Sequence, residues 1–219
     1  FLAHVRSSGV EPIVEGEQVY FDVSHTGGHG LRLVVSPDIV SPDIVSPEGI
    51  GVPIGAIDHF YEFTNLVYDA PAAVAHYADL FGLDALSFCP IHSTHYGYEG
   101  SLTLFDPHRL DRLEVIAPYL RGAGRDTGPD TTMGRYLSRF GESLYMAFAE
   151  TGELAKIAER ARECGAGVTI EPAEHLQDER GAHTVFIHPA SLGGMMLGLS
   201  RRTYAWRWSG DPARVDGGI

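Results

Sequence analysis

Two histidines, His92 and His95, stand three positions apart in the polar segment PIHSTHYGYEG. Imidazole nitrogens are common ligands of divalent transition metals, so a loop that carries both rings could present them to one ion. Surface histidines in a polar loop are the more frequent case. The spacing therefore indicates a weak candidate metal site and leaves the surface interpretation open.

A glycine-rich segment, GAGRDTGPDTTMGR, ends at Arg135. A guanidinium group binds carboxylates and phosphates through a planar fork of N–H donors, so Arg135 is a candidate contact for an anionic substrate tail. An ordinary surface loop is the simpler alternative. The segment does not match the P-loop pattern GxxxxGK[ST], and the chain contains no GxSxG nucleophile elbow. The sequence therefore predicts neither a P-loop nucleotide site nor a serine hydrolase.

The composition narrows the classes of partner. The 219 residues carry a net charge of −13, which disfavours binding to nucleic acid and to anionic membrane surfaces and leaves a small-molecule substrate as the expected partner. Cys89 and Cys164 are the only cysteines, too few for a disulfide framework, so a cytoplasmic location is expected. No apolar run approaches the roughly 20 residues of a membrane span.

Both ends of the chain differ in pattern from its centre. Residues 1–35 are predicted to be the end of a helix followed by strands, the tail of a βαβββ unit whose opening strand is not in this sequence. Residues 36–53 repeat SPDIV between prolines and are predicted to be a linker. Residues 201–219 form a C-terminal tail with both tryptophans. A homodimer is one way in which the N-terminal unit could be completed.

The central residues, 54–200, are predicted to form two complete βαβββ units in series. The first helix, APAAVAHYADLFG, has Pro71 in its first turn and Gly82 after its end. The second, TGELAKIAERARECG, is predicted to be capped by Thr151 and closed by Gly165. Four of its residues recur at the spacing of one buried helix face: Leu154, Ile157, Ala158 and Ala161.

Three segments of this central part carry a family resemblance: IDHFYEFTNLV, GRYLSRFGESLYMAFAE and VFIHPASLGGMMLGLS. Together they resemble the vicinal oxygen chelate superfamily, and within it the methylmalonyl-CoA epimerase and glyoxalase branch. The resemblance implies an α+β fold in which tandem βαβββ units form a half-open curved mixed sheet. It also implies a divalent metal that stabilises an enolate while a carboxylate moves a proton.

The resemblance assigns metal ligands residue by residue. It places His59 at the ligand position of the first strand and Glu114 at the fourth-strand position, as ligand or catalytic base. It places Tyr145 where the family has a ligand histidine, and Gly198 where the family has a ligand glutamate. Because two of four ligand positions are altered, a bound metal is an open expectation, with His92 and His95 as substitutes.

Tyr145 offers a second kind of chemistry. A phenol in a partly desolvated cup can donate a hydrogen bond or a proton to a developing oxyanion without a metal. The alternative is a plain binding pocket lined by Tyr145, Phe60, Phe105 and Met196.

The predicted function is that of a lyase or isomerase acting on a small oxygenated acid or its thioester. In this prediction His59, Glu114 and Tyr145 surround the reacting carbon. The first alternative is a metal-free small-molecule-binding protein of the resistance type. The second is an extradiol-type dioxygenase, which requires two histidines and one carboxylate around iron.

Overall fold

The computed structural model describes residues 2–15, 18–22, 24, 56–94, 96–104, 110, 112–119, 131–170, 177–178, 181–207 and 212–215. By their contacts, these residues belong to two compact units. Unit 1 comprises Phe1–Pro47, Thr64–Thr103 and Leu113–Leu144, and unit 2 comprises Glu48–Phe63, Leu104–Arg112 and Tyr145–Ile219. The predicted linker 36–53 lies outside the described residues, as do His95 and Phe105.

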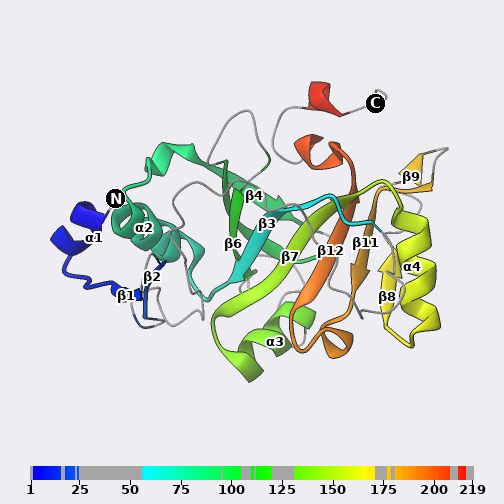
Figure 1. Cartoon of the computed structure of the whole chain (residues 1–219), viewed down its shortest axis with the longest axis horizontal. Coiled ribbons are helices and arrows are strands. Elements are labelled where there is room, and N and C mark those ends of the chain that lie inside the picture. The colour runs from blue at the N-terminus through cyan, green and yellow to red at the C-terminus, as the bar shows by residue number, and fades with distance from the viewer. Residues whose placement is uncertain are drawn as a thin grey trace. The chain divides into compact units, whose positions relative to one another are not determined.

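Unit 1 contains the N-terminal elements and the first helix of the central part (Figure 1). Its elements are α1 (Leu2–Ser7), β1 (Ile13–Glu15), β2 (Gln18–Tyr20), α2 (Ala70–Phe81), the 3-10 turn η1 (Ala85–Ser87), β4 (Phe88–Ser93), β5 (Tyr98–Leu104) and α3 (Thr132–Phe140). Strands β1 and β2 form an antiparallel pair. Val5, Val19 and Phe21 pack with Leu80 of α2, so the N-terminal elements share a core with the first helix.

Helix α2 begins and ends as the sequence predicts. The Asp69 carboxylate accepts a hydrogen bond from the Ala72 amide at 3.0 Å, and a proline occupies the first turn. Gly82 ends the helix with φ of 65°, a left-handed conformation that glycine adopts without steric cost. The helix packs Tyr77 against Val115 of the sheet.

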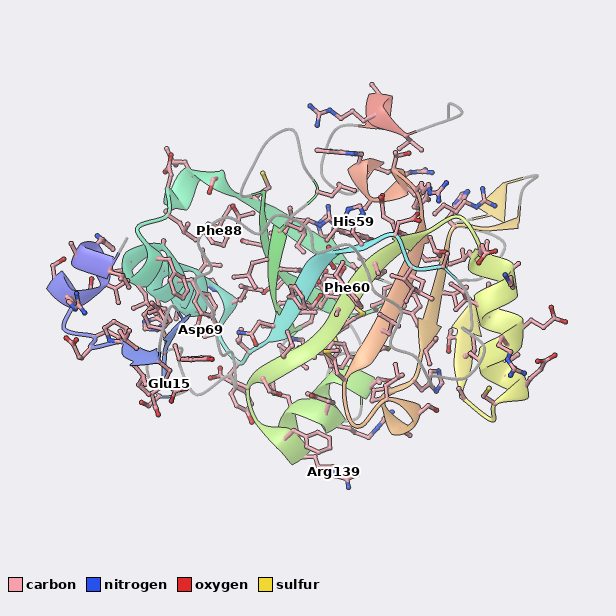
Figure 2. All side chains as sticks on the ribbon, in the orientation of Figure 1. Glu15, His59, Phe60, Asp69, Phe88 and Arg139 are labelled. Atoms are coloured by element: carbon pink, nitrogen blue, oxygen red, sulfur yellow. The ribbon has the colours of Figure 1, made fainter. Side chains whose placement is uncertain are left out.

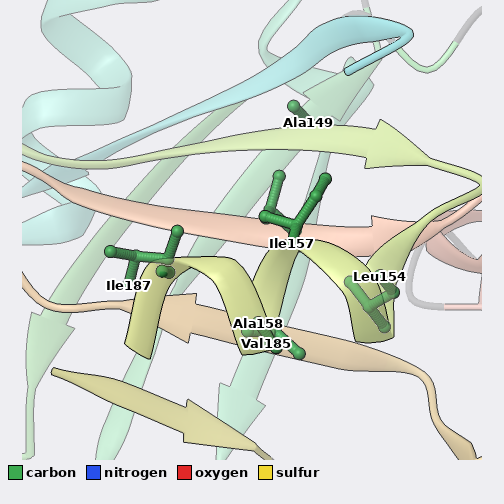
Figure 3. Packing of buried hydrophobic residues seen from close by; sticks show 8 residues of the cluster. Ala149, Leu154, Ile157, Ala158, Val185 and Ile187 are labelled. Carbon is green, nitrogen blue, oxygen red and sulfur yellow. The ribbon is translucent and has the colours of Figure 1, made fainter. Parts of the chain in front are cut away.

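Unit 2 contains the second helix and the last strands. Its elements are α4 (Leu154–Glu163), β8 (Val168–Ile170), β9 (Gln177–Asp178), β10 (Gly181–Ala182), β11 (Thr184–Ile187), β12 (Met196–Arg201) and the 3-10 turns η2 (Pro189–Ser191), η3 (Tyr204–Arg207) and η4 (Pro212–Arg214). Helix α4 covers one face of β7, β12 and β11, where its four predicted core residues pack with Ala149, Val185, Ile187 and Leu199 (Figure 3). The predicted buried face of α4 is thus confirmed.

Three further strands, β3 (His59–Leu66), β6 (Arg112–Pro118) and β7 (Ser143–Thr151), complete the sheet. Eight strands are hydrogen-bonded in the order β4-β5-β6-β3-β7-β12-β11-β8. Because β12 runs parallel to β7 and antiparallel to β11, the sheet is mixed. The structure therefore confirms the predicted α+β class with a large mixed sheet.

Two predictions about helices differ from the structure. Residues Thr132–Phe140, interpreted as the end of a glycine-rich loop and a motif segment, form helix α3, capped by the Thr131 hydroxyl. Helix α4 begins at Leu154 after Glu153, so Thr151 is not its N-cap. The Thr151 hydroxyl instead accepts a hydrogen bond from the Glu153 amide, just ahead of the helix.

None of the helices in the described part of the chain is long and apolar enough to cross a membrane.

Candidate functional site

The register of the last strands places side chains in three rows on the face of unit 2 opposite α4, which we call the inner face. Residues in register on neighbouring strands point to the same side of a sheet, and alternate residues point to opposite sides. The rows are Met146 with Met196; Phe148 with Gly198 and Phe186; and Glu150 with Ser200 and Thr184. The inner face therefore changes from apolar to polar along the strands.

Strand β3 adds two rings at the polar end of the inner face. Tyr61 shares a hydrogen bond of 2.9 Å with the Ser200 hydroxyl, and its ring centroid lies 5.9 Å from that of Phe148. The His59 ring lies 6.3 Å from the Tyr61 ring, with its Nδ1 atom 3.8 Å from Oε2 of Glu150. The imidazole of His59, which is labelled in Figure 2, is half exposed and therefore open to a ligand.

Glu150 is a buried carboxylate at the end of a strand. Only 6% of the residue is exposed, and one oxygen, Oε1, accepts a hydrogen bond of 2.6 Å from the Thr203 amide. Burial raises the pKa of Glu150, and the Thr203 amide and His59 offset only part of that increase. The second oxygen faces His59 at a distance longer than a hydrogen bond but within ion-pair range.

A half-exposed imidazole beside a carboxyl with a raised pKa is an arrangement suited to proton transfer. The imidazole can take a proton from a bound molecule, and the neighbouring carboxylate stabilises the imidazolium that forms. Asp58, next to His59 in the chain, is held by both nitrogen donors of the Arg202 fork at 2.5 and 2.9 Å. This hydrogen bonding lowers the pKa of Asp58, although burial opposes the shift.

A buried ion pair supports β3 in unit 2. Nε of Arg112 donates to Glu62 at 2.6 Å, and both side chains are almost fully buried. Another nitrogen of the same guanidinium donates to the carbonyl of Ala205 at 3.3 Å, and its carbon lies 5.3 Å from the centre of the Tyr61 ring. Arg112 therefore joins β3, β6 and η3 around the ring that adjoins the His59–Glu150 pair.

The structure places Tyr145 on the side of β7 opposite to Glu150. Tyr145 alternates with Met146 and Phe148, so it shares the face of Ala149, which packs against α4. It is 3% exposed. His59 and Tyr145 are therefore not brought together on the inner face, whereas Met146 does lie on that face.

At Gly198 the space for a side chain is filled. A Cβ atom added there would lie 2.4 Å from the Phe148 ring, closer than real Cβ atoms approach other heavy atoms. Where the family resemblance expects a ligand carboxylate, the inner face thus presents an aromatic ring over a bare backbone.

We expect Gly198→Ala to lower the free energy of unfolding by about 1–3 kcal/mol, since the Phe148 ring must move to admit the methyl group. Urea denaturation of the two proteins measures this difference. Adding Phe148→Leu to the variant should recover part of the loss, because the smaller side chain frees the space. Equal stability of Gly198→Ala and wild type would show that the ring moves without cost.

The other predicted site residues are distributed over both units. Met196 lies on the inner face, and Phe60, between His59 and Tyr61 on β3, is 49% exposed. Three lie in unit 1: Glu114, buried on β6 and accepting from the Thr64 hydroxyl at 2.7 Å; Arg135, exposed on α3; and His92, exposed on β4 opposite Glu99. His92 was expected in a loop but belongs to a strand.

The donors of the inner face do not fit the metal site that the resemblance implies. An ion used for enolate chemistry needs three or four nitrogen or oxygen ligands. Among the described residues, no three His, Cys, Asp or Glu side chains are grouped closely enough to hold one ion. The pair of His59 and Glu150 supplies only two donors, and Phe148 covers Gly198. The same shortage applies to the ligand set of an extradiol dioxygenase, so we derive no reaction step through a metal.

Sequence reasoning missed Glu150, Glu62, Arg112 and Thr203. A signal for Glu150 was present, because it follows Met146 and Phe148 at the strand period of two in an otherwise apolar strand. The partners of the other three are about 50 or more positions away in the chain, and no local pattern identifies them.

Solved structures with this architecture include methylmalonyl-CoA epimerases. A variant of the Streptomyces coelicolor enzyme in complex with 2-nitronate-propionyl-CoA is 18% identical to this chain, covers 67% of it and 98% of the epimerase, and has a TM-score of 0.50. A methylmalonyl-CoA epimerase in complex with methylmalonyl-CoA and NH4+ is 17% identical, covers 68% of this chain and 97% of its own, and has a TM-score of 0.50.

No family model matches the chain. No curated protein matches it. At such low identity, the likeness to the two epimerase structures shows the fold, which is the vicinal oxygen chelate fold expected from the sequence. Because one fold serves many reactions, the function has to be argued from the side chains of the inner face.

Proposed function

We propose that this protein is an isomerase of the epimerase type, which moves a proton on the carbon next to a carbonyl group in a small oxygenated acid or its thioester. The observation that supports this proposal is the pair of His59 and Glu150, an accessible imidazole 3.8 Å from a buried carboxylate. The two epimerase structures with the same fold bind acyl-CoA compounds, which agrees with a thioester substrate.

In the proposed reaction, the imidazole of His59 takes the proton as the bond between carbon and hydrogen breaks. The bonding electrons move to the carbonyl oxygen and form an enolate, while the Glu150 carboxylate stabilises the imidazolium. A proton from solvent water added to the other face of the carbon inverts its configuration, and the His59 imidazolium gives its proton to the hydroxide that remains. One proton leaves the carbon and one is added to it, and no oxidant or reductant is consumed.

The apolar rows of the inner face give the substrate's non-reacting part a place to bind. Met196 and Phe186 are partly exposed there, next to the buried Phe148. Apolar side chains beside a polar pair suit a ligand with an oxygenated head and an apolar body. The same surface favours the second candidate function, a protein that binds a small molecule without converting it.

Isotope exchange distinguishes the two candidates. We expect wild type to exchange the hydrogen next to the carbonyl of methyl-branched acyl thioesters or acids for deuterium in D2O, as followed by proton NMR. The variant His59→Gln should lose exchange, while His92→Gln, which changes an exposed histidine of unit 1, should keep it. If wild type bound a compound of this panel without exchange, the protein would be a binding protein. If it neither bound nor exchanged any, the substrate class would be wrong.

Cys89 and Cys164 are both free and exposed, which agrees with a reducing, cytoplasmic setting. A homodimer also stays a prediction.

A further inference from the structure

A short turn directly after β12 contacts Glu150 and Asp58, the residue that precedes His59. The turn consists of Arg202 and Thr203, and Thr203 has φ of 62°. A residue branched at Cβ rarely adopts this left-handed conformation, because the Cβ atom crowds the backbone. The surrounding contacts must therefore hold Thr203 in place, and strained residues of this kind cluster at functional sites.

The conformation of Thr203 aims its amide at Glu150. The N–H group donates to Oε1 at 2.6 Å, which fixes one oxygen of the carboxylate. With that oxygen held, the other oxygen, Oε2, faces Nδ1 of His59. A hydrogen bond from a backbone amide to a buried carboxylate is charge-assisted, and it restricts the rotation of the carboxyl group.

Arg202 binds the chain segment that carries His59. Its guanidinium forms two hydrogen bonds with Asp58, the residue before His59. The Asp58 amide in turn donates to the backbone carbonyl of Glu150 at 2.9 Å. One dipeptide thus connects the start of β3, which carries His59, with the end of β7, which carries Glu150.

Gly152 provides room for the guanidinium. A Cβ atom at this position would lie 3.2 Å from the central carbon of the Arg202 guanidinium, so the guanidinium would have to shift by a few tenths of an ångström to admit it. Gly152 follows Glu150 by two residues, and the absence of its side chain lets Arg202 pass the end of β7 to reach Asp58.

We propose that the turn of Arg202 and Thr203 is a positioning device for the His59–Glu150 pair, with Thr203 orienting the carboxylate and Arg202 fixing the segment that carries the imidazole. Neither residue transfers a proton. The catalytic meaning of this device rests on the proposed isomerase function. The contacts themselves can be tested without a substrate.

The test compares Thr203→Pro with Thr203→Gly. Proline has no N–H group and cannot adopt a positive φ, whereas glycine keeps the donor and adopts that conformation readily. We expect Thr203→Pro to lower kcat for isotope exchange by about 10- to 100-fold with little change in KM, as displacement of a catalytic group does. Thr203→Gly should retain most of the activity. Equal rates for wild type and the proline variant would overturn the proposal.

NMR spectra of the His59 ring supply the readout that needs no activity, with His59→Gln used to assign the signals. The ring signals should shift in Thr203→Pro and stay near their wild-type positions in Thr203→Gly. If they shift but wild type exchanges no hydrogen, the device stands and the proposed reaction fails. Unchanged ring signals in Thr203→Pro would show that Thr203 does not position the His59–Glu150 pair.

A second variant covers the case in which Thr203→Pro does not fold. Arg202→Gln changes a side chain that is 62% exposed, so the fold should tolerate it. It removes the fork that holds Asp58, and we expect it to shift the His59 ring signals and to reduce kcat more than KM. Ring signals and rate constants equal to those of wild type would show that Arg202 does not position the His59–Glu150 pair.

Discussion

Replacing Glu150 with glutamine should slow isotope exchange by about 100- to 10,000-fold, the usual contribution of a group that assists proton transfer. Glutamine has nearly the same shape, and its carbonyl oxygen can still accept the Thr203 amide hydrogen. It carries no negative charge, so the imidazolium of His59 loses the partner that stabilises it. The rate of deuterium incorporation into the preferred thioester or acid measures the effect.

The matched control is Glu159→Gln, which makes the same change on an exposed position of α4. It should exchange at the wild-type rate. A Glu150→Gln variant as active as this control would mean that the carboxylate has no part in the reaction. The same variant also assigns the Glu150 carboxyl signal in carbon NMR, which should titrate in wild type above the ordinary value of 4.5, because burial raises the pKa of Glu150.

Replacing Arg112 with alanine should lower the free energy of unfolding by about 3–5 kcal/mol, the usual cost of leaving a buried charge without its partner. The change leaves the Glu62 carboxylate, 3% exposed, without the guanidinium that is 2.6 Å away. It also removes the hydrogen bond to the carbonyl of Ala205 and the cation above the Tyr61 ring. Urea denaturation followed by circular dichroism measures the loss.

Two comparisons isolate the buried charge as the cause. Arg160 forms an ion pair with Glu163 on the exposed side of α4, and Arg160→Ala should leave the free energy of unfolding nearly unchanged, since solvent screens an exposed pair. The double variant Arg112→Met with Glu62→Leu removes both charges and should be far more stable than Arg112→Ala alone, since no unpaired charge stays behind. If Arg112→Ala and Arg160→Ala lowered the free energy of unfolding equally, the burial of the Arg112–Glu62 pair would not be the cause of the loss.

Local patterns in the sequence predicted most of the elements correctly. The spacing of apolar residues, together with proline at the start and glycine at the end, was sufficient for α2 and for the buried face of α4. Helix α3 was missed because its glycine and polar residues suggested a loop. Its buried Met133 and Leu137, four positions apart, are the signal that would have indicated a helix.

The site was harder to predict because a strand shifted by one residue turns every side chain to the other face. The family resemblance led to Tyr145, whereas the register of β7 and β12 turns Met146 and Phe148 to the inner face. His59 is found at the edge of that face, beside Glu150. This contact joins residues far apart in the sequence, so only the paired strands reveal it.

The ring of Phe148 over Gly198 also restricts how this protein can change by mutation. A carboxylate at position 198 would collide with the ring, and removal of the ring alone, as in Phe148→Ala, would cost about 3–5 kcal/mol through the cavity it leaves. Each single step thus passes through a less stable protein, and only the two changes together would open a path to a carboxylate. Phe148 and Gly198 are therefore coupled: the ring and a side chain at position 198 compete for the same space, so the effects of changing the two residues are not additive.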